Sequence, residues 1–165
     1  MSLILATTRF NNNTIQEQRS YVENHKIQGC IYGSPIRIKE NVPVKSHLFL
    51  LEMNNSTNKI VGIGYIQNYV YMDKYYKIYA DGNYNRYVYK GNVHIKCEEF
   101  SEKEEKIIEC LEYYLFYTPY HSKRGQGICE IPKWLKENKY KFDFSKAIKM
   151  MFLKRNLIKK PLKII

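Results

Sequence analysis

The sequence lacks the features that would place the protein in a membrane or cross-link it. There is no run of about eighteen apolar residues, so we expect no membrane-spanning segment. The opening MSLILATTRF has no basic region before its short apolar run and no cleavage pattern, so we expect no signal peptide. The cysteines (Cys30, Cys97, Cys110 and Cys129) form no C-x-x-C pair, and no histidine shows ligand spacing. We therefore expect no metal site, and mostly buried, reduced thiols in an intracellular protein, cytoplasmic or nuclear.

Acidic residues are scarce in the last quarter of the chain. Residues 123–165 contain thirteen Lys/Arg and three acids, a net charge of +10 out of +11 for the whole chain. A nearly neutral body with a basic end indicates an anionic partner: a nucleic acid, an acidic protein or an anionic membrane surface. A lysine-rich surface that only keeps the protein in solution is the simpler alternative.

The chain has 165 residues, of which 44% are hydrophobic, so it is long enough for one domain with a real core. Apolar periodicity, capping boxes at Thr14–Glu17 and Ser101–Glu104, and turn residues such as the hairpin loop NNSTN predict an α+β fold, a curled antiparallel sheet or small barrel with flanking helices. We expect a domain over residues 1–122 and a basic helical extension over 123–165 packed on it. The predicted strands are 2–8, 30–38, 47–53, 59–66 and a meander over 69–97; the predicted helices are 14–25, 101–117, a short one near 131–138, and 143–160, ended by Pro161.

The segment HSKRGQGICEIP, residues 121–132, contains the clearest candidate for a phosphate-binding loop. It fits neither the P-loop pattern nor the dinucleotide-binding pattern, because the order of its glycines and lysine is wrong for both. Basic side chains and backbone N–H groups in a glycine turn can still hold phosphate. We expect this from six consecutive or near-consecutive residues: His121, Lys123, Arg124, Gly125, Gln126 and Gly127.

The opening strand, the helix at 14–25, the segment CIYGSPIRI and the strand ending IVGIGYIQN resemble the PUA-like superfamily, in its EVE and ASCH branches. The resemblance covers residues 1–97 and implies a barrel-like domain that binds RNA or DNA without catalysis and without a cofactor. The matching cleft positions would be Arg9, Tyr32, Gly33, Ser34 and Arg37. A flat aromatic ring such as Tyr32 can stack on a base, while polar groups meet its edge and an arginine meets a phosphate.

Two other interpretations remain open. Residues 124–129 resemble the pyrophosphate loop of the GNAT acetyltransferases, an R-x-x-G-x-G/A pattern, which would imply acetyl-CoA as a cofactor. The bias toward Asn, Lys, Ile and Tyr resembles proteins from AT-rich genomes, including large DNA viruses, which would suit a scaffold protein of a virion or virus factory. No G-x-S-x-G or H-E-x-x-H pattern indicates another enzyme class.

Tyrosine is concentrated in one part of the chain, and a pair of glycines stands out in another. Nine of the sixteen tyrosines lie between Tyr65 and Tyr89, interleaved with lysines, which suits either stacking on single strands or the filling of a half-buried sheet. Gly62 and Gly64 lie two residues apart and so share one face of a predicted strand. We expect another part of the protein or a ligand to approach that face closely.

Overall fold

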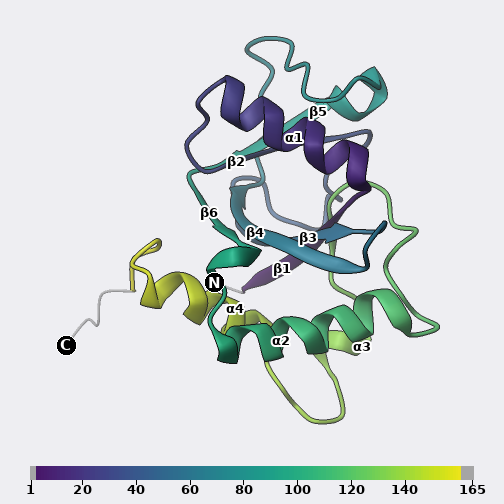
Figure 1. Cartoon of the computed structure of the whole chain (residues 1–165), viewed down its shortest axis with the longest axis vertical. Helices are drawn as coiled ribbons and strands as arrows, with labels where there is room; N and C mark the ends of the chain where they lie inside the picture. The colour runs from purple at the N-terminus through teal and green to yellow at the C-terminus, as the bar shows by residue number, and fades with distance from the viewer. Residues whose placement is uncertain (1–2, 161–165) are drawn as a thin grey trace.

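The computed structural model describes residues 3–160 and has an α+β fold with three layers (Figure 1). A five-stranded sheet lies in the middle. Helix α1, Asn12–Asn24, and a two-stranded sheet cover one face, and helices α2, α3 and α4 cover the other. The part of the predicted extension that lies beyond Lys160, Pro161 included, is outside the described residues.

The central sheet is mixed, not antiparallel as expected. β1 and β3 run parallel, with Ile4 opposite Leu48 and Phe10 opposite Asn54, because α1 and β2 intervene and carry the chain back to the same end. The hairpin of β3 and β4 is confirmed, with its loop at the predicted NNSTN segment. In sheet order the strands are β6 (Val93–Lys96), β4 (Lys59–Gln67), β3 (His47–Asn54), β1 (Ile4–Phe10) and β7 (Cys129–Glu130).

The second sheet contains only β2, Cys30–Ser34, and β5, Tyr87–Gly91. The prediction of a meander over residues 69–97 is wrong, because β5 pairs with β2 whereas β6 pairs with β4. The segment KYYKIYA is not a strand; it packs as an irregular segment followed by a 3₁₀ turn, Gly82–Asn85. The two sheets do not close into a barrel within residues 3–160.

The helices begin at side chains that bond the first free N–H groups. The capping box of Ser101 and Glu104 is confirmed at the start of α2, Glu102–Glu112. In α1 the box is formed by Asn11 and Thr14, one turn earlier than predicted. A π-helical turn, Tyr113–Tyr117, follows α2. The remaining helices are α3, Lys133–Lys136, and α4, Phe144–Lys154, which ends earlier than predicted.

Each face of the central sheet contributes to a separate core. Ala6, Leu48, Leu50 and Ile66 pack toward the two-stranded sheet and α1. Leu5, Leu51 and Ile63 point the other way, toward α2 and α4, as alternation along a strand requires. The basic extension belongs to this second core through Ile148, Met151 and Phe152 of α4, and it also supplies β7 to the central sheet.

Candidate functional site

A cavity of about 410 Å³ lies where the end of β1, the start of α1 and the glycine loop meet. The loop leaves the π-helical turn and passes beside the N-terminal end of α1 (Figure 1). Five of the predicted site residues line this cavity: Arg9, Gly33, Gly125, Gln126 and Gly127. The structure therefore brings together positions from the resemblance and from the basic loop, which lie more than ninety residues apart in the chain. No carboxylate is among the lining residues.

Arg9 is the cation of this cavity. Its guanidinium donates to the carbonyl oxygens of Ser122 (3.2 Å) and Gly127 and to Thr7 Oγ1 (2.9 Å). Within residues 3–160 it forms no ion pair, and its Nε has no hydrogen-bond partner. Burial lowers the pKa of Arg9, although the nearby Cys129 thiol partly offsets this. Arginine stays charged in proteins, so a desolvated positive charge without a carboxylate lies beside the cavity.

Both glycines of the loop lie close against side chains of β1 and β2. A Cβ at Gly125 would lie 2.9 Å from Arg9 Cζ, so the guanidinium of Arg9 would have to move. Gly127 has φ +67°, and a Cβ there would overlap Ser34 Oγ. The loop also accepts a hydrogen bond from Asn55 Nδ2 to the Lys123 carbonyl (2.9 Å). The glycine turn thus holds the loop against β1 and β2 in one conformation.

Two predicted contact residues are structural. Tyr32 is 0% exposed and donates its hydroxyl proton to Glu52 Oε2 at 2.6 Å, so the expectation that it offers a stacking surface is wrong. Ser34 is 0% exposed as well, and its hydroxyl donates to the Ile36 carbonyl at 2.5 Å. Both side chains point into the core between the sheets, because β2 is buried on that face.

The remaining predicted residues lie outside the cavity lining. Arg37 is exposed and lies over the ring of Tyr87, with Cζ 4.9 Å from the centroid. His121 Nδ1 accepts the Lys123 N–H at 3.2 Å and so shapes the loop. Lys123 is half-buried and Arg124 is exposed, both on the loop that borders the cavity. Neither of these two cations is among the residues that line the cavity.

Sequence reasoning missed the residues that form the opposite wall of the cavity. Tyr84, 42% exposed, and Asn83 come from the 3₁₀ turn, and Asn55 comes from the loop after β3. In the sequence they stand in DGNYN and NNSTN, which signal turns and nothing more. In the folded protein these residues lie around one cavity, so that together they provide an aromatic ring and asparagine amides. Asn55 Oδ1 is buried without a hydrogen-bond partner, like Arg9 Nε.

The glycine pair of β4 accommodates a buried charged cluster. Glu52 is 0% exposed and accepts from Arg19 Nη2 (2.7 Å), His94 Nε2 (3.0 Å) and Tyr32. Burial alone would raise the pKa of Glu52, but the hydrogen bond and charge of His94, together with Arg19, hold it at about 2. A Cβ at Gly62 would overlap Glu52 Oε1, and one at Gly64 would overlap Tyr32 Oη. The expected close approach is confirmed, and it comes from the protein itself.

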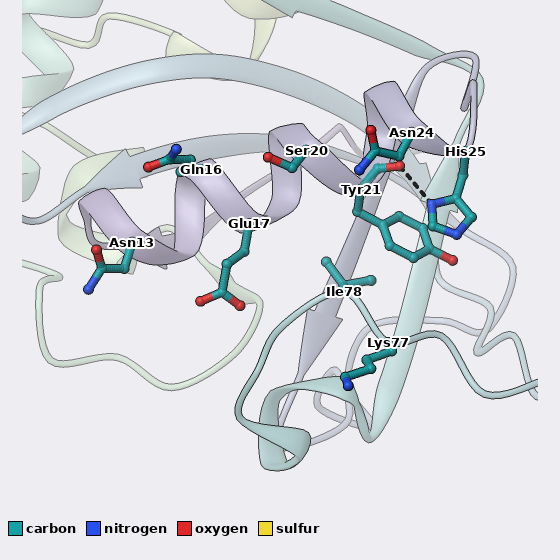
Figure 2. A pocket seen from close by; sticks show the side chains of 9 residues that line it. All are labelled: Asn13, Gln16, Glu17, Ser20, Tyr21, Asn24, His25, Lys77 and Ile78. Atoms are coloured by element: carbon teal, nitrogen blue, oxygen red, sulfur yellow. Dashed lines mark hydrogen bonds between the residues drawn. The ribbon is translucent and has the colours of Figure 1, made fainter.

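A second cavity, of about 540 Å³, lies along the exposed face of α1 (Figure 2). Figure 2 shows Glu17 and Tyr21 pointing from the helix toward Lys77 and Ile78. Tyr21 stacks on His25 with centroids 3.9 Å apart, and Glu17 Oε2 accepts the Ala80 N–H at 2.6 Å. The Glu17 bond ties the tyrosine-rich segment to α1 at this cavity.

A third cavity, of about 1010 Å³, is a groove at the opposite end of the central sheet, near the starts of β1 and β3. Its lining contains four lysines and no carboxylate. Lys90 is engaged by tyrosine rings, with Nζ 4.5 Å from the centroids of Tyr71 and Tyr76. Lys149 and Lys159 belong to the basic extension. The extension therefore adds positive charge to a concave surface, as well as a helix to the core.

Other expectations concern thiols, metals and membranes. All four cysteines are free, but only Cys30 is buried, so the expectation of mostly buried thiols is wrong. Burial raises the pKa of Cys30 to about 12. Within the described part of the chain, no cluster of His, Cys, Asp or Glu side chains is suited to a metal ion. No helix among residues 3–160 is long and apolar enough to cross a bilayer.

Comparisons of the chain with protein-family models, with curated proteins and with solved structures gave no match. The cavity at Arg9 is consequently characterised by its own chemistry: aromatic rings, three asparagine side chains, exposed loop backbone and a cation, with no carboxylate among the lining residues that the structure describes.

Proposed function

We propose that the protein binds RNA or DNA without catalysis and that the cavity at Arg9 holds one unpaired nucleotide. The observation that supports this most is the positive charge of Arg9 beside a cavity with no carboxylate. Tyr84 offers a ring face for a base, and Asn55 and Asn83 offer amide donors and acceptors for its edge. Lys123 and Arg124 then meet the phosphates on either side.

The course of the loop favours this function over acetyl-CoA binding. A CoA pyrophosphate loop uses the free N–H groups at the start of a helix. Here the loop continues into β7, Cys129–Glu130, which pairs with β1, and the four-residue α3 begins only at Lys133. The carbonyl oxygens of Ser122 and Gly127 point at Arg9, so the loop is fixed from within by a protein cation.

The PUA-like relationship is part of the proposal and is supported by the order of elements. A buried strand, a helix and a second buried strand fill residues 4–34, and the hairpin that ends in IVGIGYIQN follows. The mixed central sheet and the separate two-stranded sheet differ from the expected barrel. A nucleic-acid site between the first strand and the second is nevertheless where that relationship would put it.

Fluorescence anisotropy with short labelled RNA and DNA strands tests the function. We expect the logarithm of the association constant to fall linearly with the logarithm of salt concentration, with a slope of about −0.7 per phosphate contact on a single strand. Tyr84→Ala should weaken binding by about 5- to 150-fold, the effect of one lost base–aromatic stack. Tyr69→Ala is the matched control, because Tyr69 is 45% exposed and lies outside the cavity.

Thermal shift with acetyl-CoA supplies the opposing result. A rise in melting temperature with acetyl-CoA and none with oligonucleotides would overturn the proposal in favour of an acetyltransferase. Stability unchanged by either ligand, together with no anisotropy change, would favour a scaffold protein.

A further inference from the structure

Exposed aromatic rings gather on the helical side of the molecule, away from the cavity at Arg9. Tyr120 is 74% exposed, Phe142 43% and Trp134 38%. Tyr114 joins them: its ring centroid lies 5.8 Å from that of Trp134, which in turn lies 6.3 Å from Tyr120. We call these four residues, Tyr114, Tyr120, Trp134 and Phe142, the aromatic surface. Exposed aromatic rings that lie next to one another are where binding surfaces are sought first, because large contiguous apolar patches on monomeric proteins mark interaction sites.

The aromatic surface is built on fixed supports. Tyr114 and Phe142 both contact Phe144, with centroids 6.3 and 4.9 Å away, and Phe144 is buried in the helical core. Tyr114 lies in the π-helical turn, Tyr113–Tyr117, an irregularity that is frequent at functional sites. The Thr118 hydroxyl donates to the Tyr114 carbonyl at 2.8 Å and closes the turn. The rings are thus held in place before any ligand arrives.

Charge around the aromatic surface favours an anionic occupant. Between Tyr113 and Phe144 there are six Lys/Arg and three acids. Glu130 and Lys136 pair with each other at 2.6 Å, which leaves five cations against two acids, and one of these, Asp143, caps α4 by accepting the Lys146 N–H at 2.9 Å. Glu109 lies one turn before Tyr113 in the acidic helix α2, so negative charge borders the aromatic surface on the side of α2.

Tyr120 of the aromatic surface lies on the same loop as Gly125, which lines the cavity at Arg9. Tyr120 and Gly125 are five residues apart on the same loop, so their Cα atoms are at most about 18 Å apart. Lys123 and Arg124 lie between them. Along the chain, this loop carries an exposed aromatic ring, then two cations, then a residue that lines the cavity.

We infer that the aromatic surface binds the unpaired bases of a single-stranded nucleic acid whose next nucleotide occupies the cavity at Arg9. This inference rests on the proposed function and narrows it to single strands. Bases stack on Tyr120 and Trp134, since every base has a flat face, and the phosphates pass over Lys123 and Arg124. A duplex keeps its bases stacked on one another and cannot use the rings.

Trp134 is the single tryptophan of the chain and reports on this surface directly. With excitation where tyrosine does not absorb, titration with a single strand of about 12 nucleotides, within the usual site sizes, should quench its emission. A duplex of the same length should quench less at equal phosphate concentration. Equal quenching and equal affinity for both forms would overturn the inference while leaving nucleic-acid binding intact.

Two variants separate the aromatic surface from the cavity. Tyr120→Ala should weaken single-strand binding by about 5- to 150-fold and leave duplex binding unchanged. Trp134→Phe, which preserves a ring and the packing, should retain most of the affinity, and Tyr69→Ala should match the wild type. Unfolding midpoints verify that every variant is folded.

The outcomes distinguish the two proposals. Wild-type affinity in Tyr120→Ala together with weakened binding in Tyr84→Ala would exclude the aromatic surface and keep the cavity. Absence of binding to any strand would reject both. A Trp134 emission that changes with protein concentration alone, accompanied by sedimentation as a dimer, would identify the surface as an interface between copies of the chain and overturn the inference.

Discussion

Two regions of the protein are rich in aromatic residues and bury different shares of them. In the tyrosine-rich segment, residues 69–89, Tyr76, Tyr79 and Tyr89 are at most 4% exposed and belong to the core beside the two-stranded sheet, whereas other tyrosines of the segment, Tyr84 among them, stay exposed. In the aromatic surface, Tyr120 and Trp134 face water. Composition is the same in kind, since both regions interleave aromatic rings with lysines. The two regions differ in how far neighbouring strands and helices enclose the rings.

The cations of the two regions differ in the same way. Lys90 Nζ donates to Tyr76 Oη at 2.8 Å and lies over two tyrosine rings, and Arg37 lies over Tyr87. These charges are already satisfied by aromatic groups of the protein. Arg124 is exposed on its loop, and no hydrogen bond or ion pair of its side chain occurs within residues 3–160. A basic, aromatic sequence therefore indicates a nucleic-acid surface only where its rings and charges are not used internally.

Replacing one tyrosine in each region with alanine should give the largest difference between the two regions in the free energy of unfolding. Tyr89→Ala removes a ring that is 1% exposed and whose hydroxyl accepts the Ile38 N–H at 2.9 Å. We expect it to lower the free energy of unfolding by about 3–5 kcal/mol, the usual cost of a large buried ring. Tyr120→Ala should change it by less than about 0.5 kcal/mol, as exposed sites do. Urea unfolding measures both, and equal losses would contradict the division between the regions.

The pH dependence of the free energy of unfolding should show that the core beside the two-stranded sheet is also stabilised by a buried charge, that of Glu52. The pKa of Glu52 is about 2 in the folded protein, against 4.5 for the free group. The stabilisation from its ionised form is complete above about pH 4.5 and is lost as pH falls toward 2, because the unfolded chain binds the proton first. It amounts to about 3 kcal/mol.

Glu52→Gln is the variant that isolates this effect. It should be less stable than the wild type at neutral pH, and the difference should shrink as pH falls below about 4.5. Other carboxylates also titrate here, Glu104 among them with a pKa of about 2, so the difference between the two proteins is the quantity to measure. Lys136→Ala removes the more exposed pair with Glu130 and should cost less than about 1 kcal/mol at any pH. A constant difference between wild type and Glu52→Gln would contradict the assignment.

Local signals in the sequence predicted local structure well. The Ser101–Glu104 box set the start of α2, and the polar loop NNSTN set the turn of the β3–β4 hairpin, since both depend on residues within one turn of each other. The basic loop and Arg9 were also identified as candidates, and the structure places Arg9, Gly125 and Gly127 around one cavity. Whether they bind nucleic acid remains a prediction.

Long-range pairing is what the sequence could not supply. Nothing local in β1 shows that its residues pair in parallel with residues of β3 forty-four positions further along the chain, or that β5 and β6 enter different sheets. The same limit applies to single side chains. Tyr32 and Tyr84 are both tyrosines near glycine, yet Tyr32 is 0% exposed because β2 lies between the sheets, whereas Tyr84 lies on a turn at 42% exposure.

Replacing single cations should give the smallest effects, and these effects test the difference between the two regions most directly. Arg124→Gln should weaken oligonucleotide binding similarly for all sequences and reduce the salt slope by about one contact, or about 0.7 on a single strand. Lys90→Gln should leave affinity and slope unchanged, because Lys90 is held by Tyr71 and Tyr76. Both variants remove one positive charge, so a change in net charge affects them equally. Equal slopes in the two variants would mean that binding reports only the overall charge, whereas a difference assigns the phosphate contact to the loop that joins the aromatic surface to the cavity.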